Sequence, residues 1–586
     1  MKSFFGSFLG SCLGVLVTGV LVLILLIVLI FKGLSGIDLN SETDSTKPLN
    51  GKIIQLNLEG EWNERNSPWV MDLNNLAKPW IEKPGIHSLC ECIRQIALND
   101  TVSGLFIRFS NVQASPVLLH ELRQALIDFK SKGKKIYAYA DTYSQGAYYL
   151  ASVAHKIALN PSGLVQWKGL GYQQLYFAEA LKYWNINVDI YRCGKFKSAV
   201  EPFSSTQMSN ESRLQTHELL NTVWANMCNA IAKSRNLNSN DLNTWANTLY
   251  FNHAQKTKGV LTDTLMYESQ FINWIKIQNG IQRAHQFKTL DHYIQNTKNI
   301  ALEDHIAVLI AEGTIVDGKG ADDEIGAERY CNLIESLQQN PLVKAVVLRI
   351  NSPGGSAFAS EQIWYALKQL QATKPLVVSM GGLSASGGYY MSCTGTQVFA
   401  DPFTITGSIG VFGMIPQLQT FLKSNLKIHI DTVNTNTYSQ LGALTVPAST
   451  FEKSIIQNGV DSIYHLFLNR VATHRHTDIN TIEPVAQGRV WSAAGALKNN
   501  LIDSIGMLSD AIAWIRSKHR IQTSQIVYYP KSELQITALL QNVLNTKLDY
   551  HSNPLLKPFG PLIQSLKQHP FPGCYWMQYP TPYLIE

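Results

Sequence analysis

The sequence predicts a tandem duplication of an α/β domain, preceded by one N-terminal transmembrane helix. Three observations predict this fold class: an uncharged apolar segment near the N-terminus, strands that alternate with helices, and motifs that recur at a constant spacing. The chain has 586 residues, 45% apolar and 16% charged, so it is globular but too long for a single core. Its net charge of +6 is small and its basic residues are scattered, so no nucleic-acid partner is expected.

The N-terminal apolar segment runs from Leu13 to Phe31 without a charged residue. As a helix it would be roughly 28 Å long, enough to span the hydrocarbon core of a bilayer. A cleavable signal peptide is the main alternative, but its apolar region is usually only about 7–15 residues and ends at a small-x-small site, which does not follow here. We therefore expect an uncleaved anchor, and the polar stretch from Ser41 to Asn50 is typical of a linker that completes segment 1–50.

Beyond residue 50, short apolar runs typical of buried strands alternate with helical patterns. This order is typical of α/β domains. The predicted strands are 52–58, 104–109, 135–140 and 187–191 in the first half and 306–310, 345–350 and 375–378 in the second, and the predicted helices are 116–130 and 360–370.

The two halves are related by a constant offset of 241 positions. Ungapped matches at one offset are typical of an internal duplication. Three separated matches share it: Arg108 with Arg349, Asn160-Pro161 with Asp401-Pro402, and 146–152 with 387–393. We predict α/β repeats over residues 51–300 and 301–530, followed by a tail, 531–586, in which no motif is found.

A glycine- and serine-rich stretch follows the predicted strand 375–378 and places Ser386 between Ala385 and Gly387. Small neighbours let the backbone turn sharply and let a substrate approach, which suits a nucleophile at a strand-to-helix junction. An ordinary glycine–serine turn is the alternative interpretation. In the first repeat the equivalent residue is Gln145, so only the second repeat carries the serine.

Two adjacent glycines, Gly354 and Gly355, also occur only in the second repeat. The equivalent first-repeat stretch, 110–114, reads SNVQA. Glycines can present backbone N–H groups to an oxyanion. The second repeat is therefore equipped for chemistry at this place, and the first is not.

A serine nucleophile needs a base, and the histidines of the second repeat are the first candidates. His429 alternates with Ile428 and Ile430, a pattern expected on the outward face of a strand, and His474 follows a helix-like run. Both patterns favour solvated histidines over a catalytic base. No H-E-x-x-H motif is present, so a metalloprotease is not expected.

Lys197 is the other candidate base. It follows the predicted strand 187–191, and apolar neighbours such as Val200 would desolvate it. To act near neutral pH its pKa must fall from about 10.4 to about 7–8, at a cost of roughly 4 kcal/mol. The charge of Lys195 would lower the pKa, whereas Glu201 would raise it by pairing with the amine. A solvated lysine is the alternative interpretation.

The repeat offset favours Lys197 as the base. Lys197 lies 52 positions after Gln145, and the residue 52 positions after Ser386 is Tyr438. One repeat thus has the serine without the lysine, and the other has the lysine without the serine. This pattern is expected when a Ser/Lys enzyme duplicates and each copy loses one half of its site.

Four motifs together carry a family resemblance: MGGLSASGGYY at 380–390, NSPGGS at 351–356, TGSIGVFG at 406–413 and KSAVEPF at 197–203. They resemble bacterial signal peptide peptidase A, also called protease IV, in its long tandem-repeat form. The resemblance extends from the anchor to about residue 530. It implies a Clp-protease/crotonase-like fold and a membrane-anchored serine protease that needs no cofactor.

The resemblance also implies roles for individual residues. Ser386 would be the nucleophile and Lys197 the general base. Gly354 or Gly355, with the N–H of Gly387, would bind the oxyanion. Ser408 would hydrogen-bond the lysine amine; it is also the second candidate nucleophile, with a tight Gly–Ser turn as the alternative.

The partners and location that the resemblance implies are equally specific. The substrates would be signal peptides left in the membrane after secretion, and other extended apolar peptides. The enzyme would form a bowl-shaped homotetramer at the bacterial inner membrane, with its catalytic part on the periplasmic side. Two alternatives remain at this stage: a crotonase-like acyl-CoA hydrolase, and a non-catalytic membrane scaffold. A scaffold would be expected to lose both halves of the dyad, yet each half survives here in a different repeat.

Overall fold

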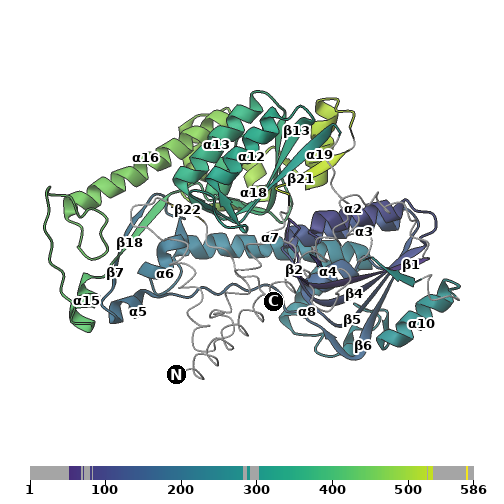
Figure 1. The fold of residues 1–586 in the computed structure, drawn as a ribbon. Coiled ribbons are helices and arrows are strands. Elements are labelled where there is room, and N and C mark those ends of the chain that lie inside the picture. Colours follow the sequence, from purple (N-terminus) through teal and green to yellow (C-terminus); the bar gives the residue numbers. More distant parts are fainter. Residues whose placement is uncertain are drawn as a thin grey trace, which may run out of the picture.

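Two largely parallel β-sheets, one from each half of the chain, form the framework of the protein (Figure 1). In this computed structural model the described residues are 52–66, 70–71, 80–81, 84–281, 287–290, 303–523, 525–531 and 576–578. The predicted membrane helix over residues 13–31 and most of the tail beyond 531 lie outside them. None of the helices within these ranges combines the length and the apolar character needed to cross a membrane.

The first sheet has six strands, all joined in parallel, in the order β8-β6-β5-β4-β1-β9. Helices α2 (Ile86–Ala97), α3 (Pro116–Ser131) and α4 (Gln145–Ala151) accompany it, and α10 (Glu268–Gln278) packs on the opposite face. The strands are β1 (Ile53–Glu61), β4 (Gly104–Gln113), β5 (Lys135–Tyr143), β6 (Lys156–Val165), β8 (Thr264–Leu265) and β9 (Phe287–Thr289).

The second sheet repeats this plan. Its order is β19-β17-β15-β13-β10-β21, with β16 beside β15 and β20 beside β16, and all pairs except β17 with β19 are parallel. Its strands are β10 (His305–Glu312), β13 (Val343–Ser352), β15 (Leu376–Ala385), β16 (Val398–Ala400), β17 (Ile405–Gly407), β19 (Val490–Ser492), β20 (Ser504–Ile505) and β21 (Ile526–Tyr529). The run β15-β13-β10-β21 corresponds to β5-β4-β1-β9 of the first sheet, in agreement with the predicted tandem duplication.

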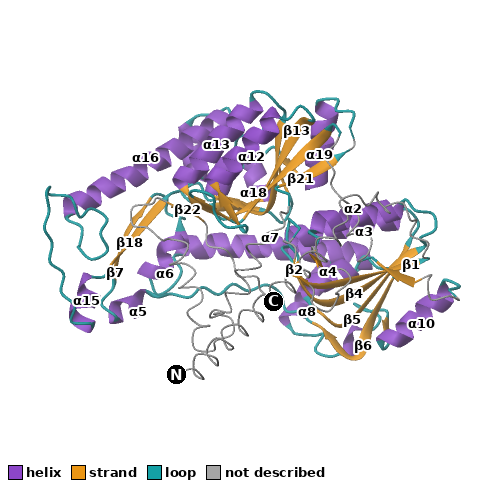
Figure 2. Ribbon diagram, in the orientation of Figure 1, coloured by secondary structure: helices purple, strands orange, loops and turns teal. Residues whose placement is uncertain are grey.

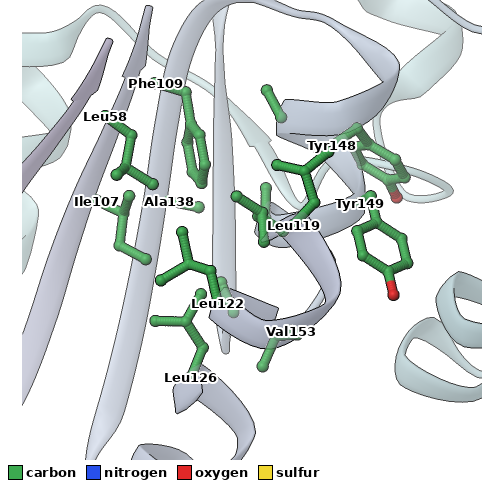
Figure 3. Close-up of a cluster of buried hydrophobic side chains, with 14 of the residues drawn as sticks. Leu58, Ile107, Phe109, Leu119, Leu122, Leu126, Ala138, Tyr148, Tyr149 and Val153 are labelled. Atoms are coloured by element: carbon green, nitrogen blue, oxygen red, sulfur yellow. The ribbon is translucent and has the colours of Figure 1, made fainter. Parts of the chain in front are cut away.

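Each sheet is buried on both faces, as the near-continuous apolar strands require. In the first unit, Leu58, Ile107 and Ala138 on the sheet face Leu122 and Leu126 of α3 (Figure 3). In the second unit, alternate residues of β10 point to opposite faces. Leu309 packs with α12 (Ala327–Gln339) and α13 (Ala357–Gln371), whereas Val308 packs with α19 (Leu508–Lys518).

A third sheet joins the two halves of the chain (Figure 2). Its order is β12-β11-β14-β22-β18-β7. The strands are β7 (Asn187–Arg192), β11 (Thr314–Val316), β12 (Glu324–Gly326), β14 (Gly354–Ser356), β18 (Phe412–Gln417) and β22 (Trp576–Gln578). Because β7 of the first half pairs antiparallel with β18 of the second, the segment that follows β7 is carried into the second unit.

Several helices complete this region, and two of them are long. The helix α7 (Asn210–Arg235) passes beneath the second unit towards the first, and α16 (Thr450–His474) packs on the second unit (Figure 1). The remaining helices are α5 (Ala178–Tyr183), α6 (Glu201–Ser204), α8 (Ser239–Asn247), α9 (Ala254–Thr257), α14 (Gly387–Ser392), α15 (Gln419–Asn425), α17 (Ile479–Ile482) and α18 (Ala493–Lys498).

Two local predictions are wrong. The strand before Ser386 does not end at Val378 but continues to Ala385, because its last part pairs with β17 and Gly381 admits the carboxylate of Glu64. A Cβ at Gly381 would lie 2.6 Å from Glu64 Oε1. The expected strand around His429 is an exposed loop, and no strand pairs with it among the described residues.

Candidate active site

Ser386 occupies the sharp turn between β15 and α14. Its backbone has φ +57° and ψ −115°, a strained conformation for a residue with a side chain. Hydrogen bonds hold the turn on both sides: its N–H donates to Gly407 O at 2.8 Å, and its carbonyl accepts from Tyr390 N at 2.8 Å. The side chain is fully buried. The strand, turn and short helix therefore fix the hydroxyl in one place.

The glycines after Ser386 are required by close packing. A Cβ at Gly387 would lie 2.5 Å from Ser360 Oγ, and a Cβ at Gly388 would lie 2.9 Å from Ser352 O. Neither position has room for a side chain. The small residues noted in the sequence are thus explained by the approach of neighbouring segments to the turn.

Lys197 lies beside Ser386, although 189 positions separate the two residues in the chain. Its Nζ is 2.6 Å from Ser386 Oγ, 3.1 Å from Ser408 Oγ and 3.2 Å from Ser408 O. A neutral amine has two N–H groups and one lone pair. It can therefore donate to the two oxygens of Ser408 and accept the hydroxyl proton of Ser386.

Burial lowers the pKa of Lys197 well below its ordinary value, since the side chain is 1% exposed. Glu201 does not oppose this shift by pairing with the amine. Its carboxylate accepts from Ser209 Oγ at 2.6 Å and from Ser209 N at 3.2 Å, at the start of α7. Lys195 is exposed, and its amine lies 5.5 Å from the ring centroid of Phe196. Desolvation is therefore the cause of the shift, rather than a neighbouring charge.

A loop of the second repeat, around Gly488, holds the lysine segment of the first. Gly488 has φ +73°, and a Cβ there would lie 2.7 Å from both N and Cβ of Lys197. Phe196 N donates to Gln487 O at 2.9 Å. Gln215 of α7 bridges the two segments: its Nε2 donates to Phe196 O at 3.2 Å, and its Oε1 accepts from Val490 N at 3.2 Å. Sequence reasoning missed Gly488 and Gln215, because contacts to backbone atoms leave no motif.

Ser408 is positioned by the same loop. Its N–H donates to Arg489 O at 2.7 Å, and its φ of +52° turns both its carbonyl and its hydroxyl towards Lys197. Ser408 therefore lies in a tight turn and also contacts the lysine amine, so the two interpretations of this residue are compatible.

The three glycines expected near an oxyanion differ in their environment. Gly387 follows Ser386 directly, and a Cβ on it would lie 3.3 Å from Gly354 Cα. Gly387 is the first residue of α14, so its N–H has no partner within the helix. The N–H of Gly354 donates to Ser352 Oγ at 3.1 Å. Gly355 is required by the contact between β14 and β11, since a Cβ there would lie 2.0 Å from Ile315 O.

The residues equivalent to Ser386 and Lys197 in the other repeat, Gln145 and Tyr438, and the rejected base candidate His474 make other contacts. Gln145 fastens the loop behind it: its Oε1 accepts from Lys168 N and Gly169 N at 3.0 and 2.8 Å. Tyr438 is half-exposed, and its ring packs against that of Phe451 at 5.1 Å between centroids. His474 accepts a hydrogen bond from Trp364 Nε1 at 3.1 Å instead of approaching Ser386.

Comparisons with known proteins agree with this arrangement. The model of peptidase family S49 matches residues 128–282 and again 368–522, and the model of Clp protease matches residues 297–404. "Protease 4" of Haemophilus influenzae is 34% identical over 437 residues, which cover 72% of this chain and 71% of that protein. "Protease 4" of Salmonella typhi is 31% identical over 469 residues, with 77% and 74% covered. "Serine protease SPPA, chloroplastic" of Arabidopsis thaliana is 29% identical over 453 residues, with 75% and 66% covered.

The fold and these relatives define an α/β serine peptidase with a duplicated S49 domain and a Clp-protease-like region at residues 297–404. The chain belongs to peptidase family S49, in the signal peptide peptidase A or protease IV group. This assignment favours peptide-bond hydrolysis over the acyl-CoA and scaffold alternatives. Both ranges matched by the S49 model lie within the predicted repeats, whose boundaries at residues 300 and 530 stay predictions.

Proposed function

We propose that this peptidase uses Ser386 as its nucleophile and Lys197 as its general base, so that one site is assembled from both repeats. The distance of 2.6 Å between Nζ and Oγ carries the proposal. The depressed pKa of the buried amine supports it, because only a neutral lysine can accept a proton.

The proposed reaction is acyl transfer to Ser386. Lys197 Nζ accepts the hydroxyl proton as Oγ attacks the carbonyl carbon of the scissile amide. The ammonium then gives this proton to the leaving nitrogen as the C–N bond breaks, which leaves an ester on Ser386. Lys197 next takes a proton from water as the water oxygen attacks the ester carbon. Its ammonium then returns this proton to Ser386 Oγ as the ester C–O bond breaks, which releases the acid and restores the serine and the neutral amine.

The oxyanion is assigned first to the N–H of Gly387, which points out of the start of α14. Gly354 is the second candidate donor. Its N–H is shared with Ser352 Oγ, so that hydroxyl would have to turn away when an oxyanion forms. Gly355 contributes by allowing β14 to approach β11, whether or not its own N–H takes part.

The substrates are proposed to be extended apolar peptides, with signal peptides as the main class. Val200 and Phe412 form a buried apolar cluster with Ile190 and Ala199, directly after Lys197 and at the start of β18. A relative from Enterococcus faecium named "Putative signal peptide peptidase SppA" is 28% identical over 230 residues, which agrees with this substrate class.

The cellular setting is part of the same proposal. The uncharged segment 13–31 would anchor the chain in the bacterial inner membrane by a single pass, with the catalytic part on the periplasmic side. A homotetramer is proposed on the family resemblance alone. Its mass in detergent, measured by light scattering, would be four times that of the chain.

Peptide cleavage by single-residue variants tests the dyad. Ser386→Ala and Lys197→Met should each abolish cleavage of a fluorogenic apolar peptide while the circular dichroism spectrum stays that of the folded enzyme. Lys195→Met is the matched control, because it removes a neighbouring exposed lysine that does not contact Ser386, and it should retain activity. Full activity in Ser386→Ala or in Lys197→Met would refute the dyad.

A further inference from the structure

The first sheet begins at an edge that carries four lysines. Because its strands are parallel, their first residues lie along the same edge. Lys52 directly precedes β1, and Lys132 lies in the turn before β5. Lys135 is the first residue of β5, and Lys156 is the first residue of β6. Lys156 is half-buried and the other three are exposed.

Two large apolar side chains are exposed at the same edge. Leu98, which follows α2, is 72% exposed, and Ile277, near the end of α10, is 77% exposed. Lys52 lies close to both segments: its carbonyl accepts from Ser103 N at 2.8 Å, and its Nζ donates to Asn279 O at 3.4 Å. We call this surface the basic edge, and it consists of Lys52, Leu98, Lys132, Lys135, Lys156 and Ile277.

The charge of the basic edge is not neutralised by nearby carboxylates. Within the described ranges, none of its four lysines forms an ion pair with an acidic side chain. Asp263 is already paired with Arg235 at 2.7 Å, and Asp128 lies 3.8 Å from Arg94. Asp100 is exposed in the turn after Leu98. The edge therefore presents an excess of positive charge beside its apolar side chains.

The second repeat indicates that the fold itself does not require these residues. At the equivalent positions it has an uncharged residue for each of three lysines and a polar residue for each apolar side chain. The replacements are Thr373, Leu376 and Gln397 for Lys132, Lys135 and Lys156, and Gln339 and Ser517 for Leu98 and Ile277. The second repeat has cations at other positions of this edge, such as Lys518 at the end of α19. The combination of strand lysines and apolar side chains belongs to the first repeat alone.

The basic edge is also the place where the chain arrives from its predicted membrane anchor. The apolar segment ends at Phe31, and about twenty residues separate it from Lys52. A flexible linker of this length spans roughly 25 Å on average. The basic edge would thus be held near the surface of the bilayer.

We propose that the basic edge docks on the anionic phospholipid headgroups of the membrane that holds the anchor. The proposal rests on the membrane location given in the proposed function. Each lysine close to an anionic bilayer strengthens attachment about fivefold, and Leu98 and Ile277 enter the boundary between headgroups and acyl chains. The strands of the first sheet then rise from the membrane, and the carboxyl edge of that sheet faces away from it.

Hydroxyl-radical footprinting of the full chain in lipid nanodiscs tests this contact. Discs of phosphatidylcholine alone are compared with discs in which about one lipid in three is phosphatidylglycerol. Oxidation of Leu98 and Ile277 is measured relative to that of Val433, which is 97% exposed and lies far from this edge in the sequence. We expect it to be at least about fivefold lower on the anionic discs and to recover in high salt. Equal oxidation on the two lipids would overturn the proposal.

Charge reversal tests whether this particular surface makes the contact. The double variant Lys132→Glu with Lys135→Glu should abolish the lipid-dependent protection of Leu98. Lys423→Glu with Lys427→Glu is the matched control, because it makes the same change of charge at two exposed lysines in and after α15. The control should keep the protection. Equal loss in the two double variants would show that net charge, and not the basic edge, causes the effect, and would overturn the proposal.

Carbonate extraction separates this proposal from the proposed membrane location. If alkaline carbonate releases the chain from vesicles, the anchor fails. The basic edge still stands in that case if the chain floats with vesicles that contain phosphatidylglycerol and is released from them by salt. If the chain resists carbonate but its footprint is the same on both lipids, the anchor stands and the docking fails.

Discussion

Arg349 of the second repeat and Glu64 of the first form a fully buried ion pair with two contacts. Nε lies 3.0 Å from Oε2, and Nη2 lies 3.0 Å from Oε1. Glu121 of α3 approaches the same guanidinium at 2.9 Å, and His87 of α2 bridges the two carboxylates. These ion pairs link the first repeat to Arg349 of the second. Arg349 Nη1 also donates to Ser379 Oγ at 3.0 Å, so the cluster contacts β15, the strand that leads to Ser386.

Removing the central cation should destabilise the protein strongly. Arg349→Met would leave the carboxylates of Glu64 and Glu121 buried without their partner, which costs about 3–5 kcal/mol of unfolding free energy. Arg108→Met, at the equivalent position of the first repeat, is the control. Arg108 is 31% exposed and pairs with Glu268, so its loss should cost less than about 1 kcal/mol. Urea unfolding measures both, and equal losses would show that the buried cluster does not hold the repeats together.

The same cluster should give stability a pH dependence through His87. Burial lowers the pKa of His87, but the carboxylates of Glu121 and Glu64 outweigh it and raise the pKa to about 9. The charged ring is favoured in the folded state, so its stabilisation is complete below the unfolded pKa of about 6.5 and is lost as pH rises through about 9.

The stability difference between wild type and His87→Gln should therefore shrink between pH 6.5 and 9. His465→Gln, on an exposed position of α16, controls for the loss of a histidine. Urea midpoints across this pH range provide the measurement. A difference that stays constant with pH would contradict the raised pKa.

Sequence reasoning reached the fold and the pair Ser386 and Lys197 by the same means. The offset of 241 positions exposed the duplication, and the duplication showed that Ser386 and Lys197 each lack a counterpart in the other repeat, which led to the proposed dyad. It could not predict that Arg349 is buried whereas Arg108, at the equivalent position, is partly exposed. The carboxylates that pair with each arginine come from distant segments of the chain, so the local sequence does not reveal them. Gly488 was missed for a similar reason: a single glycine in a sequence does not show which distant backbone segment packs against it.

Gly488 supplies a prediction about activity. Gly488→Ala would place a methyl group 2.7 Å from the backbone of Lys197 and shift the amine, and a misplacement of about 1 Å costs roughly 100-fold in kcat. Gly442→Ala is the control for backbone strain, because Gly442 has a similar φ of +82° with no atom within 4 Å of the added methyl. Peptide cleavage compares the two, and equal rates would mean that Gly488 does not position the lysine.

Ser408 should act on the lysine and not on the substrate. Ser408→Ala removes the hydroxyl at 3.1 Å from Nζ but keeps the carbonyl contact at 3.2 Å. We expect kcat/KM to fall about tenfold, the value of one hydrogen bond to a catalytic group. A serine-reactive fluorophosphonate should still label Ser386 in this variant. Complete loss of labelling, together with an adduct on Ser408 in the wild type, would make Ser408 the nucleophile.

The site and rate of covalent labelling test the central claim most directly. A fluorophosphonate is reacted with wild type and Lys197→Met at neutral pH, and the adduct is located by peptide mass spectrometry. The proposed dyad predicts a single adduct on Ser386 in the wild type and a rate at least about 100-fold lower in Lys197→Met, the range of general-base catalysis. Labelling of Ser386 at the same rate without Lys197, or an adduct on another residue, would contradict a site shared between the two repeats.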